Sequence, residues 1–530
     1  MEKRLIIAIV LSILVISIFQ ILFQPPKKTQ SSPPIQKMIT SPAKKEIISK
    51  NVFQKTISKE KKTIIETEKY ILTFTNKGGS LKDIKLKEYT DSNSDSPLHL
   101  IKNIEKDRAI FSMESETLPE ELSECEFILA KKSRNEIAYT YSVPGKFKLI
   151  KEYYFHNTND YIELRISVQN LGDATIYRDY ALLGASGLQP TSSVMGRRFI
   201  EINSIVDGKI VRNTRVKNGD SFIKGIVSWT GVKERYFSII LKPQQDVEGV
   251  ILKQINKTDL ASGIKTKRNP IYPGTTMMDS YILYIGPNDI AKLSKVGFGL
   301  EQIINYGIFG GISKFLLIIL RMFYKIVRNW GIAIILLTFL INITLFPLTK
   351  KSFLSMRKIQ EIQPHIEKLR NVHKDNPQKL NKELAAIYRE YNINPLGGCL
   401  PLLIQMPIFI ALYQGLIRSI ELKGANFLWI KDLSNPDFVR IPFNLPFLGN
   451  EIHILPLLMV GAMFFQQKIS TKSTAVASKE QQQQQKFMMA FFPLFFGFLF
   501  YNFPSGLVLY WLTNTILMVI EHSSMRRSLK

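Results

Sequence analysis

The sequence has 530 residues, of which 45% are hydrophobic, and a formal net charge of +26 at pH 7. The chain is too long for one compact domain, and its composition averages a polar middle with strongly apolar ends. The excess of Lys and Arg does not indicate a nucleic-acid-binding protein, because these residues are scattered without interleaved aromatic side chains or cluster beside apolar runs. The six dispersed His residues and two distant Cys residues, Cys125 and Cys399, indicate no metal site, no cofactor and no structural disulfide.

The amino terminus predicts a transmembrane anchor at residues 1–24. Its apolar run, residues 5–23, follows Lys3 and Arg4 and approaches the roughly 20 residues that cross a bilayer. The run is longer than the core of a secretory signal peptide, and QPPKK follows it in place of a small-residue cleavage site. We therefore expect an uncleaved anchor with a cytoplasmic amino end, followed by a flexible linker rich in Pro, Ser and Lys at 25–60.

Residues 61–295 predict a large antiparallel β-sandwich. The segment DYIELRISVQN has the alternation of a half-buried strand, with apolar residues at Ile162, Leu164, Ile166 and Val168. The segment TFTNKGGSLKDIKLKEY predicts two strands joined by a tight turn. The region contains no nucleophile elbow, HExxH or Walker A motif, so we expect a periplasmic binding or spacing domain and not an enzyme.

Residues 296–329 contain an apolar segment that could cross the membrane or lie on its surface. Gly310, Gly311 and Lys314 interrupt it, as in an interfacial amphipathic helix. The following segment, 350–396, carries ten Lys and Arg residues and should lie inside the cell. A crossing within 296–329 would place that segment outside, so we predict an interfacial helix.

The remaining apolar runs predict five transmembrane helices, at 330–349, 397–420, 452–468, 487–503 and 504–523. The loop 421–451 has more acidic than basic residues, which suits the periplasm, whereas 469–486 and the tail 524–530 are basic and suit the cytoplasm. The predicted fold is a polytopic α-helical membrane protein with a five-helix core, an amino-terminal anchor and a periplasmic antiparallel β-sandwich.

The cytoplasmic segment 350–396 predicts a helical hairpin, with Asn376 and Pro377 starting its second helix. A connector this long exceeds what helix packing requires, which favours a docking role over an inert linker. The candidate docking residues are Lys350, Lys351, Arg357 and Lys358.

Three of the predicted transmembrane helices carry amide and hydroxyl side chains. Thr338 and Asn342 are four residues apart and share one helical face. Gln405 lies in a second helix, and Asn514 lies between two threonines in a third. Polar contacts between helices explain a lone residue of this kind, but a set spread over three helices predicts a wet cavity open to the cytoplasm. No Asp, Glu, Lys or Arg lies deep in these helices, which disfavours an ion-coupled transporter.

Three long motifs resemble the YidC membrane protein insertase family: NWGIAIILLTFLINITLFPLTKKSFLSMRKIQEIQP, YNINPLGGCLPLLIQMPIFIALY and FPSGLVLYWLTN. A weaker resemblance extends to FTNKGGSLKDIKLKEY, WTGVKERYFSIIL and YILYIGPND. An anchor followed by a large sandwich is similar to the Gram-negative form of the family.

The resemblance implies a groove, open to cytoplasm and lipid, that inserts nascent membrane proteins into the bacterial inner membrane without nucleotide hydrolysis or catalysis. Its implied partners are nascent membrane proteins and membrane lipids, with the Sec translocon, the ribosome and signal recognition components as further candidates, and no specific nucleic acid. The groove residues expected from the motifs are Thr338, Asn342, Gln405, Met406, Phe409, Tyr510, Trp511 and Asn514.

Two positions depart from the family pattern. Asn342 stands where the family usually has an arginine, and Trp511 stands where a tyrosine is common. The first departure removes a fixed positive charge from the expected groove. A polytopic channel or transporter is the main alternative function, and a membrane-tethered enzyme that processes sugars is a more distant one.

Overall fold

The computed structural model describes residues 60–528, except 92–93, 102–108, 119–121, 157–159, 191–195, 218, 255–258, 374–375, 392–399, 446–448 and 472–478. The chain divides into two compact units, Met1–Ser58 and Lys59–Lys530, and every described residue belongs to the second. The predicted anchor, nearly all of the predicted linker, and Cys399 lie outside the described residues.

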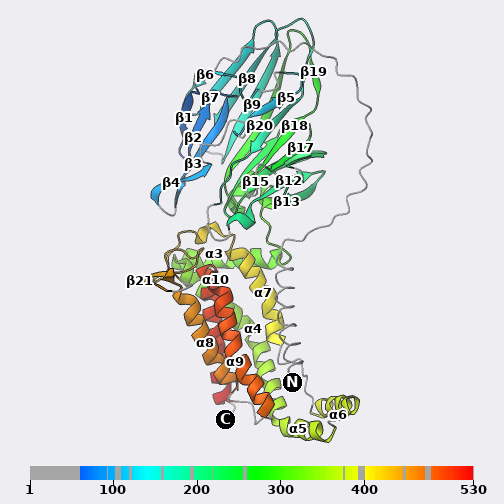
Figure 1. Cartoon of the computed structure of the whole chain (residues 1–530), viewed down its shortest axis with the longest axis vertical. Helices are drawn as coiled ribbons and strands as arrows, with labels where there is room; N and C mark the ends of the chain where they lie inside the picture. Colours follow the sequence, from blue (N-terminus) through cyan, green and yellow to red (C-terminus); the bar gives the residue numbers. More distant parts are fainter. Residues whose placement is uncertain are drawn as a thin grey trace. The chain divides into compact units, whose positions relative to one another are not determined.

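Residues 62–287 form antiparallel β-sheets (Figure 1). The largest sheet has nine strands, in the order β13 (Lys209–Asn213), β12 (Glu201–Val206), β15 (Val227–Lys233), β16 (Phe237–Pro243), β20 (Thr276–Pro287), β9 (Tyr161–Asn170), β8 (Phe147–Phe155), β7 (Glu136–Val143) and β6 (Ile128–Lys132). A second sheet has five strands, in the order β14 (Asp220–Lys224), β17 (Val247–Gln254), β18 (Leu260–Thr266), β11 (Tyr180–Ala185) and β5 (Met113–Ser115).

Two smaller sheets complete this region. One has four strands in sequence order, β1 (Lys62–Glu66), β2 (Tyr70–Thr75), β3 (Ser80–Asp91) and β4 (Ser94–Ile101). The other pairs β10 (Ile176–Arg178) with β19 (Asn269–Ile271). The turn between β2 and β3 uses Gly78 and Gly79, with φ of 65° and 56°, which only glycine adopts without strain. The predicted strand, turn and strand are therefore confirmed.

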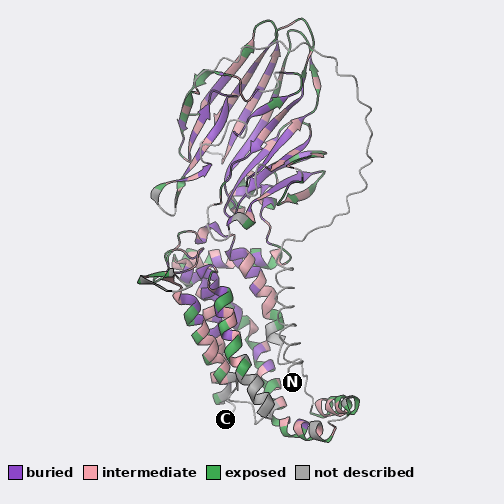
Figure 2. Cartoon of the chain, viewed as in Figure 1, coloured by how far each residue is buried: buried purple, intermediate pink, exposed green. Residues whose placement is uncertain are grey.

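The nine-stranded and five-stranded sheets share one hydrophobic core (Figure 2). Strand β9 alternates between buried and half-buried residues, and Ile162, Leu164, Ile166 and Val168 are at most 1% exposed. This confirms the half-buried strand predicted from the sequence. The sheet region as a whole confirms the expected β-rich domain.

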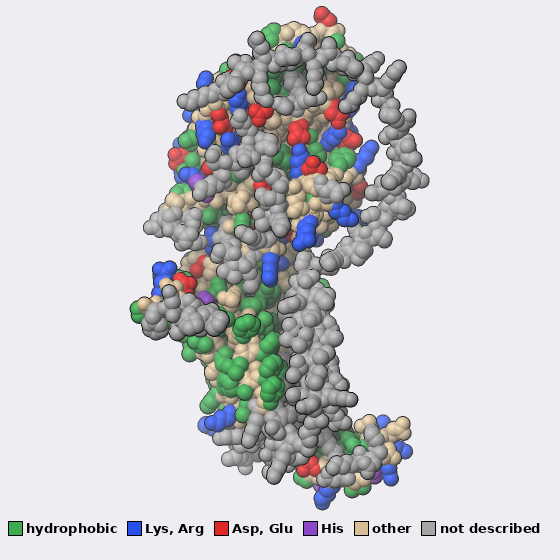
Figure 3. Space-filling model, in the orientation of Figure 1, with side chains coloured by type: hydrophobic (Ala, Val, Ile, Leu, Met, Phe, Trp, Pro, Cys, Tyr) green, Lys and Arg blue, Asp and Glu red, His purple; other side chains and the backbone are tan. Residues whose placement is uncertain are grey.

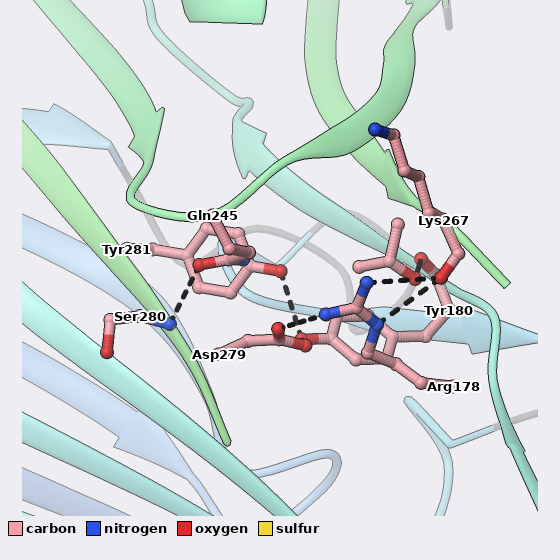
Figure 4. A network of polar contacts seen from close by, with 8 residues as sticks. Arg178, Tyr180, Gln245, Lys267, Asp279, Ser280 and Tyr281 are labelled. Carbon is pink, nitrogen blue, oxygen red and sulfur yellow. Dashed lines mark hydrogen bonds and ion pairs between the residues drawn. The ribbon is translucent and has the colours of Figure 1, made fainter. Parts of the chain in front are cut away.

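A network of buried polar side chains joins β10, β11 and β20 (Figure 4). The guanidinium of Arg178 lies 2.5 Å from a carboxylate oxygen of Asp279 and also donates to the carbonyl of Lys267. The hydroxyl of Tyr180 donates to the other carboxylate oxygen of Asp279 at 2.5 Å and lies 2.9 Å from the hydroxyl of Tyr281. Arg178 and Asp279 are 5% and 2% exposed, so this ion pair is shielded from water.

Helices make up most of the remaining chain. They are α2 (Ile290–Val296), α3 (Gly310–Val327), α4 (Trp330–Glu361), α5 (Gln363–Val372), α6 (Pro377–Glu390), α7 (Leu400–Leu416), α8 (Ile454–Thr471), α9 (Lys479–Phe500) and α10 (Ser505–Ser528). Shorter elements are the 3₁₀ turns η2 (Gly196–Phe199), η3 (Leu300–Ile303) and η4 (Ile420–Leu422), and the hairpin of β21 (Val439–Leu445) and β22 (Gly449–Ile452).

Two helices extend past the predicted membrane boundaries. Helix α4 continues without a break from the predicted transmembrane segment 330–349 through Pro347 to Glu361. A proline removes one backbone hydrogen bond, and the helical turns on both sides of Pro347 persist. The predicted loop 469–486 is also partly helical, because α8 reaches Thr471 and α9 already begins at Lys479.

The predicted helical hairpin forms from α5 and α6. The side chain of Asn376 accepts a hydrogen bond from the backbone of Lys379, which confirms its role as the cap of α6. Ile362 and Ile366 are buried and pack against apolar residues of α6.

Among the described residues, one helix, Trp330–Ile359, is long and apolar enough to cross a bilayer by length and composition. Shorter apolar helices cover Leu403–Leu416, Ile454–Ile469 and Met489–Phe500. The helix α3 buries Leu316, Leu317 and Leu320 but exposes other large apolar side chains, namely Phe315, Ile318, Met322 and Ile326.

Candidate functional site: a polar and aromatic contact among α4, α7 and α10

Much of the helical region has an apolar surface, and long stretches of its helices carry no charged side chain. Hydrophobic side chains gather over the helices, whereas Lys, Arg, Asp and Glu side chains are scattered over the sheets and lie at the far end of the helical region (Figure 3). The stretches 330–349, 400–417 and 487–520 contain no Asp, Glu, Lys or Arg. Leu337 of α4, Leu412 of α7 and Leu509 of α10 belong to one hydrophobic cluster. Any polar group in this core must therefore be compensated by neutral partners.

Asn342 of α4 and Asn514 of α10 form a buried hydrogen bond in this core. The amide nitrogen of Asn342 donates to the side-chain oxygen of Asn514 at 3.0 Å and to the carbonyl of Thr338 at 2.8 Å. The hydroxyl of Thr338 donates to the carbonyl of Ile334 at 2.7 Å. Thr338, Asn342 and Asn514 are 0%, 8% and 6% exposed.

The sequence predicts that these three residues line a wet cavity. The structure shows that Thr338, Asn342 and Asn514 are buried and that a hydrogen bond joins the two asparagines, so a cavity at this point requires α4 and α10 to part. The structure does bring Thr338, Asn342 and Asn514 together, although 172 positions separate the two asparagines.

The polar contact continues to α8 through Gln466 and Met518, which the sequence patterns did not predict. The side-chain amide of Gln466 donates to the sulfur of Met518 at 3.4 Å. Met518 lies one turn from Asn514, whose amide approaches the same sulfur at 4.0 Å. The signal that could have identified Gln466 is its position as an amide at the end of the apolar run of α8.

An aromatic contact lies one turn from Asn514 on α10. The ring of Trp511 packs edge to face against Phe409 of α7, with ring centroids 4.8 Å apart. It also stacks on Phe496 of α9 at 5.7 Å and lies 5.2 Å from Phe500. Trp511 and Asn514 are three residues apart and therefore share a side of α10. One helix thus carries both the polar and the aromatic contact.

The other predicted groove residues lie on α7 and α10 in different environments. Gln405 and Met406 are half-buried, and Phe409 is 8% exposed. Tyr510 is 1% exposed, and its hydroxyl makes no hydrogen bond of standard geometry within the described part of the chain. Gln405 lies close enough to this hydroxyl to interact with it. Among the described residues, no hydrogen bond joins Gln405 to the asparagine pair.

The four predicted docking residues lie on the far half of α4. Lys350, Lys351, Arg357 and Lys358 are all exposed. Arg357 lies 3.4 Å from Glu361, one turn further along the helix. An exposed pair of this kind adds little stability.

Two family models match the two halves of the chain. Residues 62–319 match the family model described as the YidC periplasmic domain, and residues 322–530 match the model described as the 60Kd inner membrane protein. The membrane protein insertase YidC of Pelobacter propionicus is 32% identical over 98% of each chain. That of Geobacter metallireducens is 30% identical over 100% of this chain and 99% of its own. A crystal structure of an active YidC insertase has a TM-score of 0.37 and 20% identity, over 88% of this chain and 92% of that one.

Proposed function

Because the chain belongs to the YidC family of membrane protein insertases, we propose that it moves hydrophobic segments of nascent proteins into the inner membrane and assists their folding there. The chain is an inner-membrane protein with a periplasmic β-rich domain. The proposed role requires no covalent chemistry and no nucleotide.

The proposed topology has six crossings, an amino-terminal anchor plus α4, α7, α8, α9 and α10. The amino terminus and the α5–α6 hairpin would lie in the cytoplasm, and the sheets in the periplasm. The positive-inside rule supports this arrangement, since the segment 350–396 is strongly basic.

The proposed substrate path opens where α4 meets α10. A charged residue at the bilayer centre costs about 2.5–3.5 kcal/mol on insertion scales, whereas a hydrogen bond between membrane helices averages about 0.6 kcal/mol. Parting Asn342 from Asn514 is therefore cheap compared with dragging a charged tail through lipid. The freed amides would then form hydrogen bonds with water and with the polar part of a substrate. The buried, uncharged amide pair is the observation that carries this proposal.

The aromatic contact supplies the apolar side of the proposed path. Phe409 and Phe500 are buried, and once the path opens they would, with Trp511 and Phe496, offer large ring faces to a hydrophobic segment. Lys350 and Lys351, exposed toward the end of the same helix as Asn342, would form a positive entrance. Insertion along this path would need no external energy source, because burial of the substrate's apolar segment supplies the driving force.

Substitution of Asn342 tests the proposal. In liposomes containing the full chain, Asn342→Leu should insert a model single-span protein several-fold more slowly than the wild type, because no amide remains on α4 to solvate the polar tail. Protease protection of the inserted tail measures the rate.

Thr344→Leu is the matched control. Thr344 lies two residues away on the same helix, is exposed, and bonds only to the carbonyl of Leu340. Insertion by Thr344→Leu should equal that of the wild type. Equal rates for Asn342→Leu and Thr344→Leu would remove the proposed path from this contact.

A further inference from the structure

Two arginines from distant parts of the chain meet at one aromatic ring. The guanidinium carbons of Arg235 and Arg418 lie 6.0 and 5.2 Å from the centroid of Phe199. Arg235 lies in the turn between β15 and β16, Arg418 follows the end of α7, and Phe199 ends η2. The exposed Arg198 precedes that ring, and all three guanidiniums act electrostatically on the phenol of Tyr413.

Arg235 and Arg418 both donate hydrogen bonds to neutral groups. Arg235, which is 3% exposed, donates to the carbonyls of Ile417 and Ser434 at 2.6 and 3.0 Å. Arg418 donates to the backbone carbonyl and the side-chain oxygen of Gln414. The Nε atom of Arg418 is buried and has no hydrogen-bond partner among the described residues.

The nearby carboxylates are engaged elsewhere. Glu201 pairs with the buried Lys233 at 2.9 Å. Glu234 accepts hydrogen bonds from the backbone nitrogens of Tyr236 and Phe237. Among the described residues, neither Arg235 nor Arg418 forms an ion pair with a carboxylate, so this cluster has an excess of positive charge.

The end of α7 explains only part of this arrangement. A helix carboxyl terminus attracts a cation, which accounts for one arginine at position 418. It also accounts in part for Arg235, which donates to the carbonyl of Ile417, but it does not account for Arg198 beside them, because like charges at close range repel. Removing guanidiniums from water without a counter-charge is also unfavourable. The arginine fork matches the oxygen atoms of a phosphate group.

We propose that Arg198 and Arg418, beside Phe199 and Tyr413, bind the phosphodiester headgroup of an anionic phospholipid. The neighbouring helices favour a lipid over free phosphate. Helix α7 has no charged residue up to Ile417, and α3 packs so closely on it that a side chain at Gly415 would meet Ser313. Phe315, Ile318 and Met322 are exposed on the side of α3 that faces away from Ser313 and α7, so α3 also presents an apolar surface to its surroundings. The proposal rests on the membrane location that the family provides and does not depend on the insertion path.

Native mass spectrometry of the full chain in detergent tests the site, with phosphatidylglycerol or phosphatidylcholine added at equal concentration. The wild type should retain phosphatidylglycerol preferentially. Arg418→Gln should bind it about tenfold more weakly, as expected for loss of one charge-assisted hydrogen bond. Arg215→Gln is the control, because Arg215 is exposed and lies outside the cluster. If Arg418→Gln fails to fold, Arg198→Gln replaces it, because Arg198 is exposed. Arg198→Gln should also bind phosphatidylglycerol more weakly than the wild type, by a smaller factor.

Three outcomes would overturn the proposal. The first is equal retention of both lipids by the wild type. The second is equal phosphatidylglycerol binding by Arg418→Gln, or by Arg198→Gln in its place, and by Arg215→Gln. The third is a rise in melting temperature with inorganic phosphate that matches the rise with phosphatidylglycerol, which would assign the site to free phosphate. Insertion by the wild type would remain intact in each case, so these results are separate from the test of Asn342.

Discussion

The sheet region and the helical region both bury polar side chains, but they compensate for this burial in opposite ways. The sheets bury full charges, as in the pair of Arg178 with Asp279. The helical core buries neutral amides, as in the pair of Asn342 with Asn514. A buried ion pair is costly to break, because either partner alone is left uncompensated. An amide pair costs less to part, so the opening proposed for the helical core would require less energy than breaking the ion pair of the sheets.

Breaking the ion pair of the sheets should have the largest effect. Asp279→Ala leaves Arg178 buried without its carboxylate and removes the acceptor of the Tyr180 hydroxyl. We expect a loss of roughly 3–5 kcal/mol in the free energy of unfolding. Hydrogen exchange of β10, β11 and β20 in the full chain measures this loss locally.

An exposed ion pair of the same region provides the control. Lys267 and Asp246 lie 3.1 Å apart with side chains 51% and 86% exposed. Asp246→Ala should change stability by at most about 1 kcal/mol. Comparable losses for Asp279→Ala and Asp246→Ala would contradict the view that burial makes the first pair important.

Lys151 of β8 sharpens the comparison because it is a buried ammonium that forms no ion pair with a carboxylate in the described part of the chain. Its ammonium donates to the carbonyls of Gly78 and Phe111 at 2.7 and 2.6 Å, and burial lowers the pKa of Lys151 to about 7. The unfolded chain keeps this proton up to about pH 10. Between about pH 7 and pH 10 the unfolded state therefore binds more protons, and this group makes stability rise with pH by up to about 1.4 kcal/mol per unit.

Lys151→Met should remove that dependence. The melting temperature of the wild type minus that of Lys151→Met should increase from pH 7 to pH 9. This quantity should have its lowest value below pH 7. Differential scanning fluorimetry of both full chains at several pH values gives the comparison. Parallel curves for the two proteins would show that Lys151 does not titrate in this range.

The amide pair should show the smallest effect. A double-mutant cycle with Asn342→Leu, Asn514→Leu and the double variant should give a coupling of about 0.6 kcal/mol, and no more than about 1.7 kcal/mol. Unfolding of the full chain in mixed micelles by denaturant measures it. A coupling as large as that of a buried ion pair would make opening of this contact costly and would weaken the proposed path.

Local patterns in the sequence predicted the parts of the fold that depend on neighbouring residues. The alternation in DYIELRISVQN predicted the buried face of β9, and the cap at Asn376 predicted the start of α6. The spacing of Thr338 and Asn342 predicted their shared face, and the bond from Asn342 to the carbonyl of Thr338 follows from it. The end of α4 at Glu361 was not predicted, because a proline such as Pro347 weakens a helix and the surrounding packing decides whether it continues.

The sequence by itself therefore determined the strand and helix periodicities, the uncharged apolar runs and the family. The tertiary structure alone decided that Asn342 meets Asn514, that Trp511 meets Phe409, and that Arg235 binds the carbonyl beside Arg418. Periodicity fixes which face of an element a residue occupies, since neighbours along the chain set it. Which residues meet across two elements depends on how those elements pack, and that is set by contacts between residues far apart in the sequence.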